Sequence, residues 1–186
     1  MRSYFYLMAQ LPYLIYEQKP PMNSVTFKVL AQYFLDETDA AFMENLSLNP
    51  VFSGSNSGCD FIDNWKDWEH ALKLNLAKER AIKLKRENLI SQEPPFFPLE
   101  AAAAASKAVE EHSPLEGEIV LDKARWIAID SLAGNDTFNR NSVYAYFLKL
   151  LLLERRQSFN VEKGFAEYKS LYASIVESAQ HRGEHT

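Results

Sequence analysis

The sequence predicts an all-α protein, an elongated multi-helix bundle of about seven helices within 186 residues. Apolar residues recur at spacings of three and four along most of the chain, which is the pattern of helices with one buried face. Glycine and proline, six and eight residues in all, fall mainly between these periodic stretches. No pair of segments shows the two-residue alternation that neighbouring strands would need.

Residues 1–58 are predicted to form N-terminal helices followed by a loop. Tyr4 to Leu7 favour a strand by propensity, but no partner strand is evident, so the conformation of this N-terminal segment stays open. A helix capped by Asn23 or Ser24 is indicated by one apolar face, made of Phe27, Leu30, Ala31 and Phe34. A short helix is expected between Asp36 and Leu46, and a loop rich in serine and glycine follows it.

Residues 60–90 are predicted to hold the longest helix, from Asp60 to about Leu89, because this stretch contains no glycine or proline. It carries two apolar stripes. One runs through Trp65 and Trp68, and the other runs through Leu74 and Leu84. Two stripes on one helix indicate that it packs between two neighbours.

Residues 99–181 are predicted to form the C-terminal helical part of the same domain, which spans 1–186. The helix expected from Ser113 to Leu132 has the clearest start, because Ser113-Pro114-Leu115-Glu116 combines an N-cap serine, an N1 proline and an N3 glutamate. Val143 to Leu153, after a cap at Asn139 or Asn141, is apolar almost all round and is expected at the centre. A last helix is expected from Asn160.

Composition excludes several classes of function. The net charge of −5 argues against general nucleic-acid binding, which needs attraction to phosphate. The single cysteine, Cys59, excludes internal disulfides and cysteine-cluster metal sites. The densest apolar stretch, Val143 to Leu153, contains Lys149 and is much shorter than the roughly 20 residues of a membrane span. We therefore expect a cytoplasmic protein without direct membrane insertion.

Motifs for catalysis are absent from the sequence. None of the four histidines follows a glutamate by three residues, as a di-iron bundle requires, and there is no HExxH, GxSxG or phosphate-binding loop. Cys59 has no histidine beside it in sequence. The expectation is a protein that is not an enzyme and holds no cofactor or metal.

One stretch stands out by its charge. Residues 78–88 carry five basic and two acidic side chains, a net +3. The basic residues are Lys78, Arg80, Lys83, Lys85 and Arg86. A solvated helix face would explain them, and so would docking to an acidic protein surface.

Arg155 and Arg156 end the most apolar helix. A favourable interaction with the helix dipole would explain them. Arginine also pairs well with carboxylates on neighbouring helices, and the candidate acids here are Glu118, Asp122 and Asp130.

Several segments resemble a bacterial family encoded together with the subunits of V-type (archaeal-type) rotary ATPases. They are residues 4–12, 20–21, 24–27, 65–69, 72–81, 114–118, 121–130 and 146–155. The strongest is Leu121-Asp122-Lys-Ala-Arg125-Trp126-Ile-Ala-Ile-Asp130, followed by Tyr146-Phe-Leu-Lys149-Leu-Leu-Leu-Leu-Glu154-Arg155. That family is similar in turn to the central-stalk component that is designated C in archaeal ATPases and d in eukaryotic ones. This component is all-helical and has three similar domains.

The resemblance implies a non-catalytic ATPase subunit, a reduced equivalent of the C-type stalk component that couples the central rotor stalk to the membrane ring. Its partners would be the central stalk and the ring, and the complex would hold it at the inner membrane. It would take part in coupling ATP synthesis or hydrolysis to ion transport. The alternatives are an accessory or assembly factor of the same ATPase, or an unrelated small helical enzyme.

Overall fold

The computed structural model describes residues 4–52, 56–90, 93, 98–159, 169 and 171–172. About 70% of the described residues are helical and none of them lies in a strand, so the all-α prediction is confirmed for this part of the chain. The helices are α1 (Tyr4–Gln10), α2 (Ser24–Gln32), α3 (Glu37–Glu44), α4 (Asp60–Lys83), the 3-10 helix η1 (Glu87–Leu89), α5 (Leu99–Glu110), α6 (Pro114–Ala133) and α7 (Arg140–Ser158).

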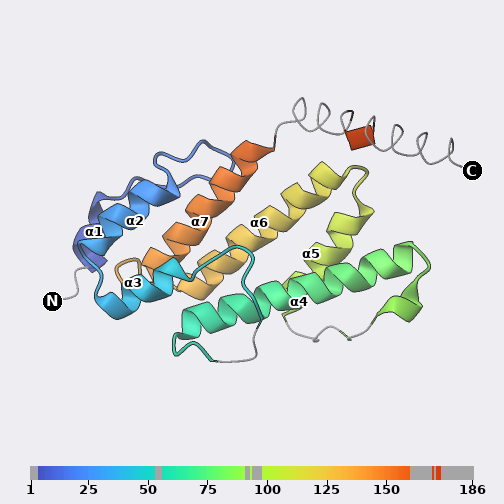
Figure 1. Ribbon diagram of the computed structural model, residues 1–186, viewed down its shortest axis with the longest axis horizontal. Coiled ribbons are helices and arrows are strands. Elements are labelled where there is room, and N and C mark those ends of the chain that lie inside the picture. The colour runs from blue at the N-terminus through green and yellow to red at the C-terminus, as the bar shows by residue number, and fades with distance from the viewer. Residues whose placement is uncertain are drawn as a thin grey trace, which may run out of the picture.

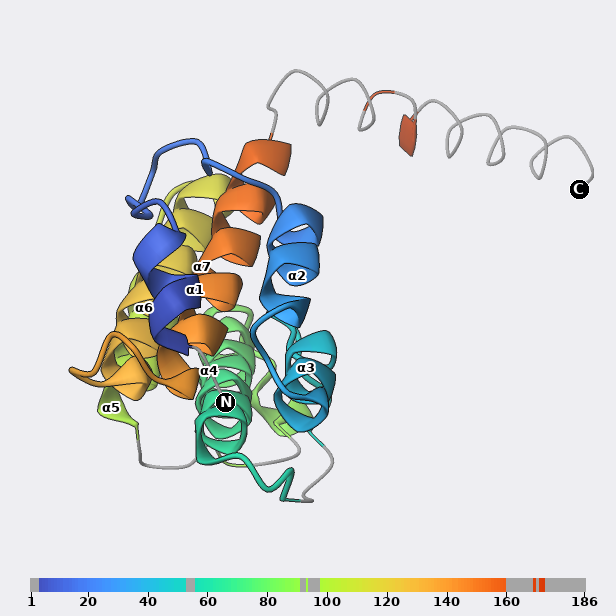
Figure 2. The same cartoon turned by 90° about the vertical axis from the view of Figure 1, so that its left-hand side faces the viewer.

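The helices pack as a chain of neighbours around α7. Helix α4 contacts α5 and α6, α5 contacts α6, and α6 contacts α7. On its other side α7 contacts α1, α2 and α3, as Figure 1 and Figure 2 show. Because α7 lies between α6 and the N-terminal helices, few of its side chains reach solvent.

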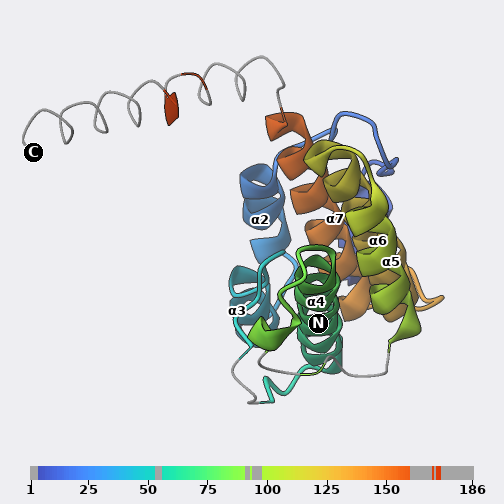
Figure 3. The ribbon, with the colours of Figure 1, turned by 90° about the vertical axis from the view of Figure 1, so that its right-hand side faces the viewer.

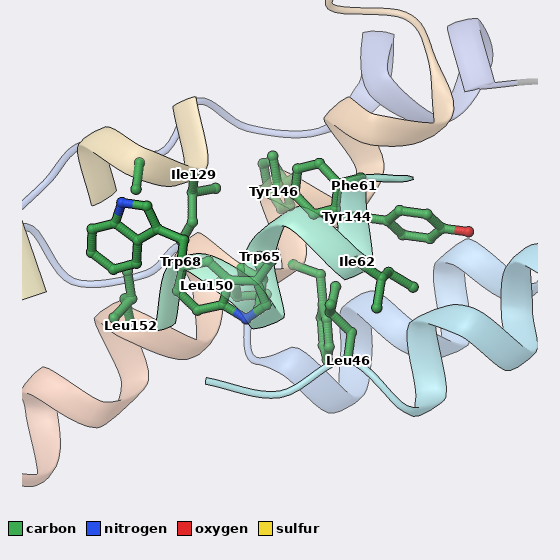
Figure 4. Packing of buried hydrophobic residues seen from close by; sticks show 14 of the residues in the cluster. Leu46, Phe61, Ile62, Trp65, Trp68, Ile129, Tyr144, Tyr146, Leu150 and Leu152 are labelled. Carbon is green, nitrogen blue, oxygen red and sulfur yellow. The ribbon is translucent and has the colours of Figure 1, made fainter. Parts of the chain in front are cut away.

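Apolar side chains of α4, α6 and α7 form the centre of one continuous core. Trp65 and Trp68 of α4 stack with their ring centres 5.8 Å apart. Figure 4 shows them among side chains such as Ile129 of α6 and Leu150 of α7, both of which are fully buried. The prediction that Val143 to Leu153 forms the central helix is confirmed. None of the helices in the described ranges combines the length and apolar character needed to cross a lipid bilayer.

Short polar side chains start the helices at the predicted places. Asn23 accepts the backbone N–H of Thr26 at 2.7 Å, and Asn139 accepts that of Ser142 at 2.9 Å. At α6, Ser113 and Glu116 form the reciprocal capping box that their spacing predicts. These caps satisfy backbone donors that the helix itself leaves without partners.

The structure settles the conformation of the N-terminal segment, which the sequence left open, and it differs from the sequence prediction at the end of the long helix. Tyr4 to Leu7, which favour a strand by propensity, lie in helix α1, because α1 buries Leu7 against the core and no strand in the described ranges is available to pair with it. The long helix ends at Lys83 rather than near Leu89, because Lys85 takes a left-handed conformation with φ of 55°. The helix expected from Asn160 lies almost entirely outside the described residues.

Gly117 of α6 lies close to the backbone of α5. A Cβ atom at this position would be 2.8 Å from the backbone oxygen of Ala108, which is shorter than van der Waals contact. Only glycine allows this approach to Ala108 of α5.

Gly117→Ala should therefore lower the free energy of unfolding by about 1–2 kcal/mol, because the clash with a backbone atom outweighs the higher helix propensity of alanine. Urea denaturation would measure it. Lys123→Ala, at an exposed position of the same helix, is the control and should change stability by less than about 0.5 kcal/mol. A stabilised Gly117→Ala protein would contradict the close approach of α5 and α6.

Candidate functional site

A network of charged side chains connects α4, α6 and α7 inside the bundle. Arg125 donates from Nε and Nη2 to the two carboxylate oxygens of Glu69, at 3.0 and 2.9 Å. Its Nη1 donates to Oδ1 of Asp122 at 2.9 Å, and the same oxygen accepts from Arg155 Nη1 at 3.0 Å. Arg155 Nη2 then donates to Glu118 Oε2. We call these five residues the ionic network.

Burial decreases along the ionic network. The side chain of Glu69 is completely buried, and those of Asp122 and Arg125 are 2% and 8% exposed. Arg155 and Glu118 reach solvent at 32% and 31% exposure. The network therefore runs from the interior of the bundle to its surface near the C-terminal end of α7.

The ionic network contains three carboxylates and two guanidinium groups, so it carries one excess negative charge when all five are ionised. Burial raises the pKa of Asp122, although the charges of Arg155 and Arg125 act to lower it. One oxygen of this carboxylate, Oδ2, has no hydrogen-bond partner among the described residues. For Arg125, burial acts to lower the pKa, but the hydrogen bonds and charges of Glu69 and Asp122 raise it above its usual value.

Helical spacing brings the members of the network together. Glu118, Asp122 and Arg125 lie four and three residues apart on α6, so they share one face. Glu69 lies on the buried stripe of α4 between Trp65 and Leu72, where an apolar residue is normal. The close α5–α6 contact at Gly117 and the capping box fix the start of α6. They thereby fix the positions of Glu118, Asp122 and Arg125 along the axis of this helix.

A second buried polar cluster connects α1, α3 and α7. Asp39 of α3 is completely buried and accepts the hydroxyl hydrogen of Tyr4. It also accepts that of Tyr144 at 3.3 Å and lies 3.7 Å from Arg140 Nη1. Burial, together with the charge of Asp39, raises the pKa of Tyr144 far above its usual value. Both groups of polar contacts involve α7.

The predicted ion-pairing residues form partly different pairs from those expected. Arg155 contacts Glu118 and Asp122, two of the three proposed acids. Asp130 of α6 pairs with Lys149 of the neighbouring helix α7 instead. The ammonium group of Lys149 also lies 4.7 Å from the centre of the Trp126 ring. Arg156 pairs with none of these three acids. It donates to the Tyr16 hydroxyl at 2.9 Å and lies 3.3 Å from Glu17, so its expected pairing with α6 is wrong.

The structure divides the basic stretch into two groups. Lys78 pairs with Glu93 at 2.8 Å, and Lys83 donates to the backbone oxygen of Val109 near the end of α5. Arg80, Lys85 and Arg86 are exposed, and in the described ranges no ion pair or side-chain hydrogen bond involves them. Of the five basic residues, these three therefore have charged groups that remain without a partner in the described part of the chain.

A pocket of about 510 Å³ lies between residues 8–16, the end of α6 and the start of α7. Tyr16, Trp126, Tyr146 and Lys149 line it together with aliphatic side chains. Two of the tyrosine hydroxyls in it already have partners: Tyr146 donates to the backbone oxygen of Pro12 at 2.9 Å, and Tyr16 donates to that of Ile119 at 3.3 Å. The pocket is therefore mainly an apolar surface.

Cys59 is completely buried at the N-terminus of α4, and His70 stacks on Phe52 with ring centres 3.9 Å apart. No group of three or more histidine, cysteine, aspartate or glutamate side chains in the described ranges could hold a metal ion.

Sequence reasoning assigned no role in the network to Glu69 or Arg125, although these two form its most buried pair. Their positions carried a signal. Each lies on an apolar helix stripe, Glu69 between Trp65 and Leu72 and Arg125 between Leu121 and Ala128. Charged residues at such positions are almost always paired. Two residues of opposite charge at such positions in one sequence are therefore candidates for a single buried ion pair.

Arg125→Met should lower the free energy of unfolding by about 3–5 kcal/mol, because it leaves the buried charge of Glu69 without its partner. The double variant Glu69→Leu/Arg125→Met removes both charges and should be much more stable than the sum of the two single variants implies. Urea denaturation of the four proteins in this cycle would measure the coupling. A loss below about 1 kcal/mol in Arg125→Met would contradict a buried pair.

Asp122→Asn should change how stability depends on pH. Because burial raises the pKa of Asp122, its contribution to folding is greatest below the ordinary pKa of about 3.9 and falls as pH rises through the raised value. Asparagine keeps an acceptor oxygen but does not titrate. The stability difference, wild type minus variant, should therefore decrease with rising pH in urea titrations from about pH 3 to 8. Asp67→Asn, at an exposed carboxylate for which the described residues show no ion pair, is the control, and a difference independent of pH would contradict the assignment.

Residues 101–179 match a protein family described as "Protein of unknown function (DUF2764)". The matched stretch includes nearly all of α5 and the whole of α6 and α7, and so contains Glu118, Asp122, Arg125 and Arg155 of the ionic network, but it does not include Glu69. No curated protein and no solved structure matches the chain. Over the stretch that contains four of the five network residues, the chain is similar to this family.

Proposed function

We propose that the chain is a non-catalytic subunit of a V-type ATPase, equivalent to the central-stalk component designated C in archaeal and d in eukaryotic ATPases, and that it couples the central rotor stalk to the membrane ring. One observation supports this above the others. All five residues of the ionic network fall in segments that resemble the ATPase-encoded family. Those segments are 65–69, 114–118, 121–130 and 146–155.

The ionic network suits a subunit that transmits force. Apolar contacts are non-directional, so helices held by them alone can slide or rotate at low cost. A guanidinium bound to both oxygens of one carboxylate has a fixed distance and orientation. Arg125 therefore fixes α6 relative to α4. Arg155 connects α7 to α6 through separate hydrogen bonds to Asp122 and Glu118. Torque applied to one of these helices would pass to the others with little deformation.

The position of exposed apolar side chains also agrees with a coupler, which needs two docking surfaces. At one end of the molecule, Phe5 of α1 and Phe138 of the α6–α7 loop are 55% and 45% exposed and contact each other with ring centres 4.8 Å apart. At the opposite end, Ile82 and Leu84 are 43% and 64% exposed where α4 ends. Figure 1 shows α1 and the C-terminal end of α4 at opposite ends of the bundle.

If the proposal is correct, the chain purified from native membranes with an affinity tag should bring the stalk and catalytic subunits of the V-type ATPase with it in constant proportion. Native gel electrophoresis followed by mass spectrometry would measure this. Membranes from which the chain is depleted should hydrolyse ATP without transporting ions, because the catalytic part would turn without driving the ring.

Two outcomes would contradict the proposal. Recovery of the chain without any ATPase subunit would exclude a subunit role. Recovery only with incomplete particles, together with normal coupling in the depleted membranes once assembly is complete, would identify an assembly factor instead.

A further inference from the structure

The pocket of about 510 Å³ beside α1 has walls from three parts of the chain. Residues 8–16 form one wall, residues between Trp126 and Gly134 form the second, and residues between Thr137 and Lys149 form the third. Figure 2 faces this side of the molecule, with α1 nearest to the viewer, whereas Figure 3 faces the opposite side, where α4 and α5 lie in front. The volume of the pocket is within the range of roughly 300–1,000 Å³ that is usual for small-molecule sites.

Hydrogen bonds hold the segment that follows α1 to both neighbouring helices. Tyr146 of α7 donates to the backbone oxygen of Pro12, and Tyr16 donates to that of Ile119 in α6. Arg156 of α7 in turn donates to the Tyr16 hydroxyl at 2.9 Å. Because these bonds fix the wall made by residues 8–16, the pocket is formed before any ligand enters it, and binding does not have to order this segment.

Among the described residues that line the pocket, the ionisable side chains have no net charge at pH 7. Asp130 and Lys149 form an ion pair with each other, and the tyrosines are neutral at this pH. Ser142 donates to the backbone oxygen of Asp136 at 2.5 Å. Burial raises the pKa of Tyr146 to about 12, so its hydroxyl is poorly hydrated. A charged ligand would therefore give up its hydration without gaining a free partner of opposite charge.

We propose that this pocket binds one neutral, hydrocarbon-rich small molecule. The molecule would contact the apolar part of the lining, which includes Met8, Leu11, Leu14, Ile15, Ala133 and Phe138. Its affinity would come from the apolar area that both surfaces remove from water, while the ion pair of Lys149 and Asp130 stays intact at the edge of the site. This proposal does not depend on the ATPase assignment, and the purified chain alone suffices to test it.

The first test measures binding of N-phenyl-1-naphthylamine, a neutral probe whose fluorescence increases in apolar surroundings, to the full chain. Binding should saturate at one probe per chain. Three competitors with the same alkyl chain then test the charge of the ligand: 1-decanol, decanoate and decylammonium. The neutral alcohol should displace the probe at a concentration at least about tenfold lower than either ion, because only the ions must lose a charged group's hydration.

The second test fills the pocket. Ala133→Phe adds a ring to its lining and should weaken probe binding at least about tenfold, because the ring takes the space of the ligand. Ala9→Phe does the same from an exposed position of α1 and decides the outcome if Ala133→Phe unfolds. Ala41→Phe, at an exposed position of α3 outside the pocket, is the control and should keep the affinity of the wild type. Circular dichroism checks that each variant is folded.

Lys149→Met removes the cation that lines the pocket and separates a neutral ligand from an anionic one. Affinity for the neutral probe should stay within about threefold of the wild type, since apolar contacts supply the binding. Decanoate that binds more tightly than 1-decanol, and only when Lys149 is present, would overturn the proposal. The absence of saturable probe binding to the wild type, or equal weakening in the filled variants and Ala41→Phe, would overturn it as well.

Vesicles of phosphatidylcholine distinguish two sources of the same chemistry. Sedimentation of the wild-type chain with these vesicles, lost in Ala133→Phe, identifies the ligand as an acyl chain of a bilayer lipid. A chain that stays in solution while 1-decanol displaces the probe identifies a free molecule. Failure of the chain to co-purify with ATPase subunits would overturn the subunit assignment and leave these binding measurements unaffected.

Discussion

The pairing of Arg125 with Glu69 is the interaction on which the relative position of α4, α6 and α7 depends. A guanidinium stays ionised inside a protein, so the buried side chain of Arg125 must find acceptors for its donors wherever it is placed. Glu69 supplies two of these acceptors, and only one separation of α4 and α6 allows both bonds at normal length. The aromatic core around Trp65 supplies most of the burial, while this pair selects one arrangement of the helices among several that would bury similar area.

Helix α7 connects this half of the molecule to the N-terminal half through polar contacts near both of its ends. Tyr144, near its start, reaches Asp39 of α3, and Arg155, in its last turn, reaches Asp122 and Glu118 of α6. Between these contacts the helix is apolar and almost fully buried. Near its C-terminus Glu154 also accepts the first backbone N–H of α2, from Ser24, at 2.6 Å. A helix anchored in this way can move only if several buried polar groups lose their partners together.

The sequence was most informative where a local pattern determines the structure by itself. Ser113 and Glu116 are three residues apart, and a capping box needs nothing more. The apolar run of α7 predicted a central helix because no amphipathic surface helix has that composition. The helical state of α1 could not be read from Tyr4 to Leu7, since it depends on packing against α7. The left-handed turn at Lys85 could not be predicted either, because lysine carries no signal for that conformation.

For the candidate site, the pairing of Arg155 with two of the proposed acids could be predicted from their charges and from the position of Arg155 at a helix end. The pairing of Arg125 with Glu69 could not, because it depends on the packing of two helices that are distant in sequence.

Cys59 gives the chain a built-in reporter of local opening. It is the single cysteine in the sequence, it is completely buried, and its backbone oxygen accepts the first-turn hydrogen bond of α4 from Asp63. A thiol reagent can reach its sulfur only when the beginning of α4 separates from the core. The rate of labelling therefore reads the free energy of that separation directly, without any competing thiol. Because α4 also carries Glu69, labelling kinetics would report how firmly the ionic network holds this helix while the rest of the bundle stays folded.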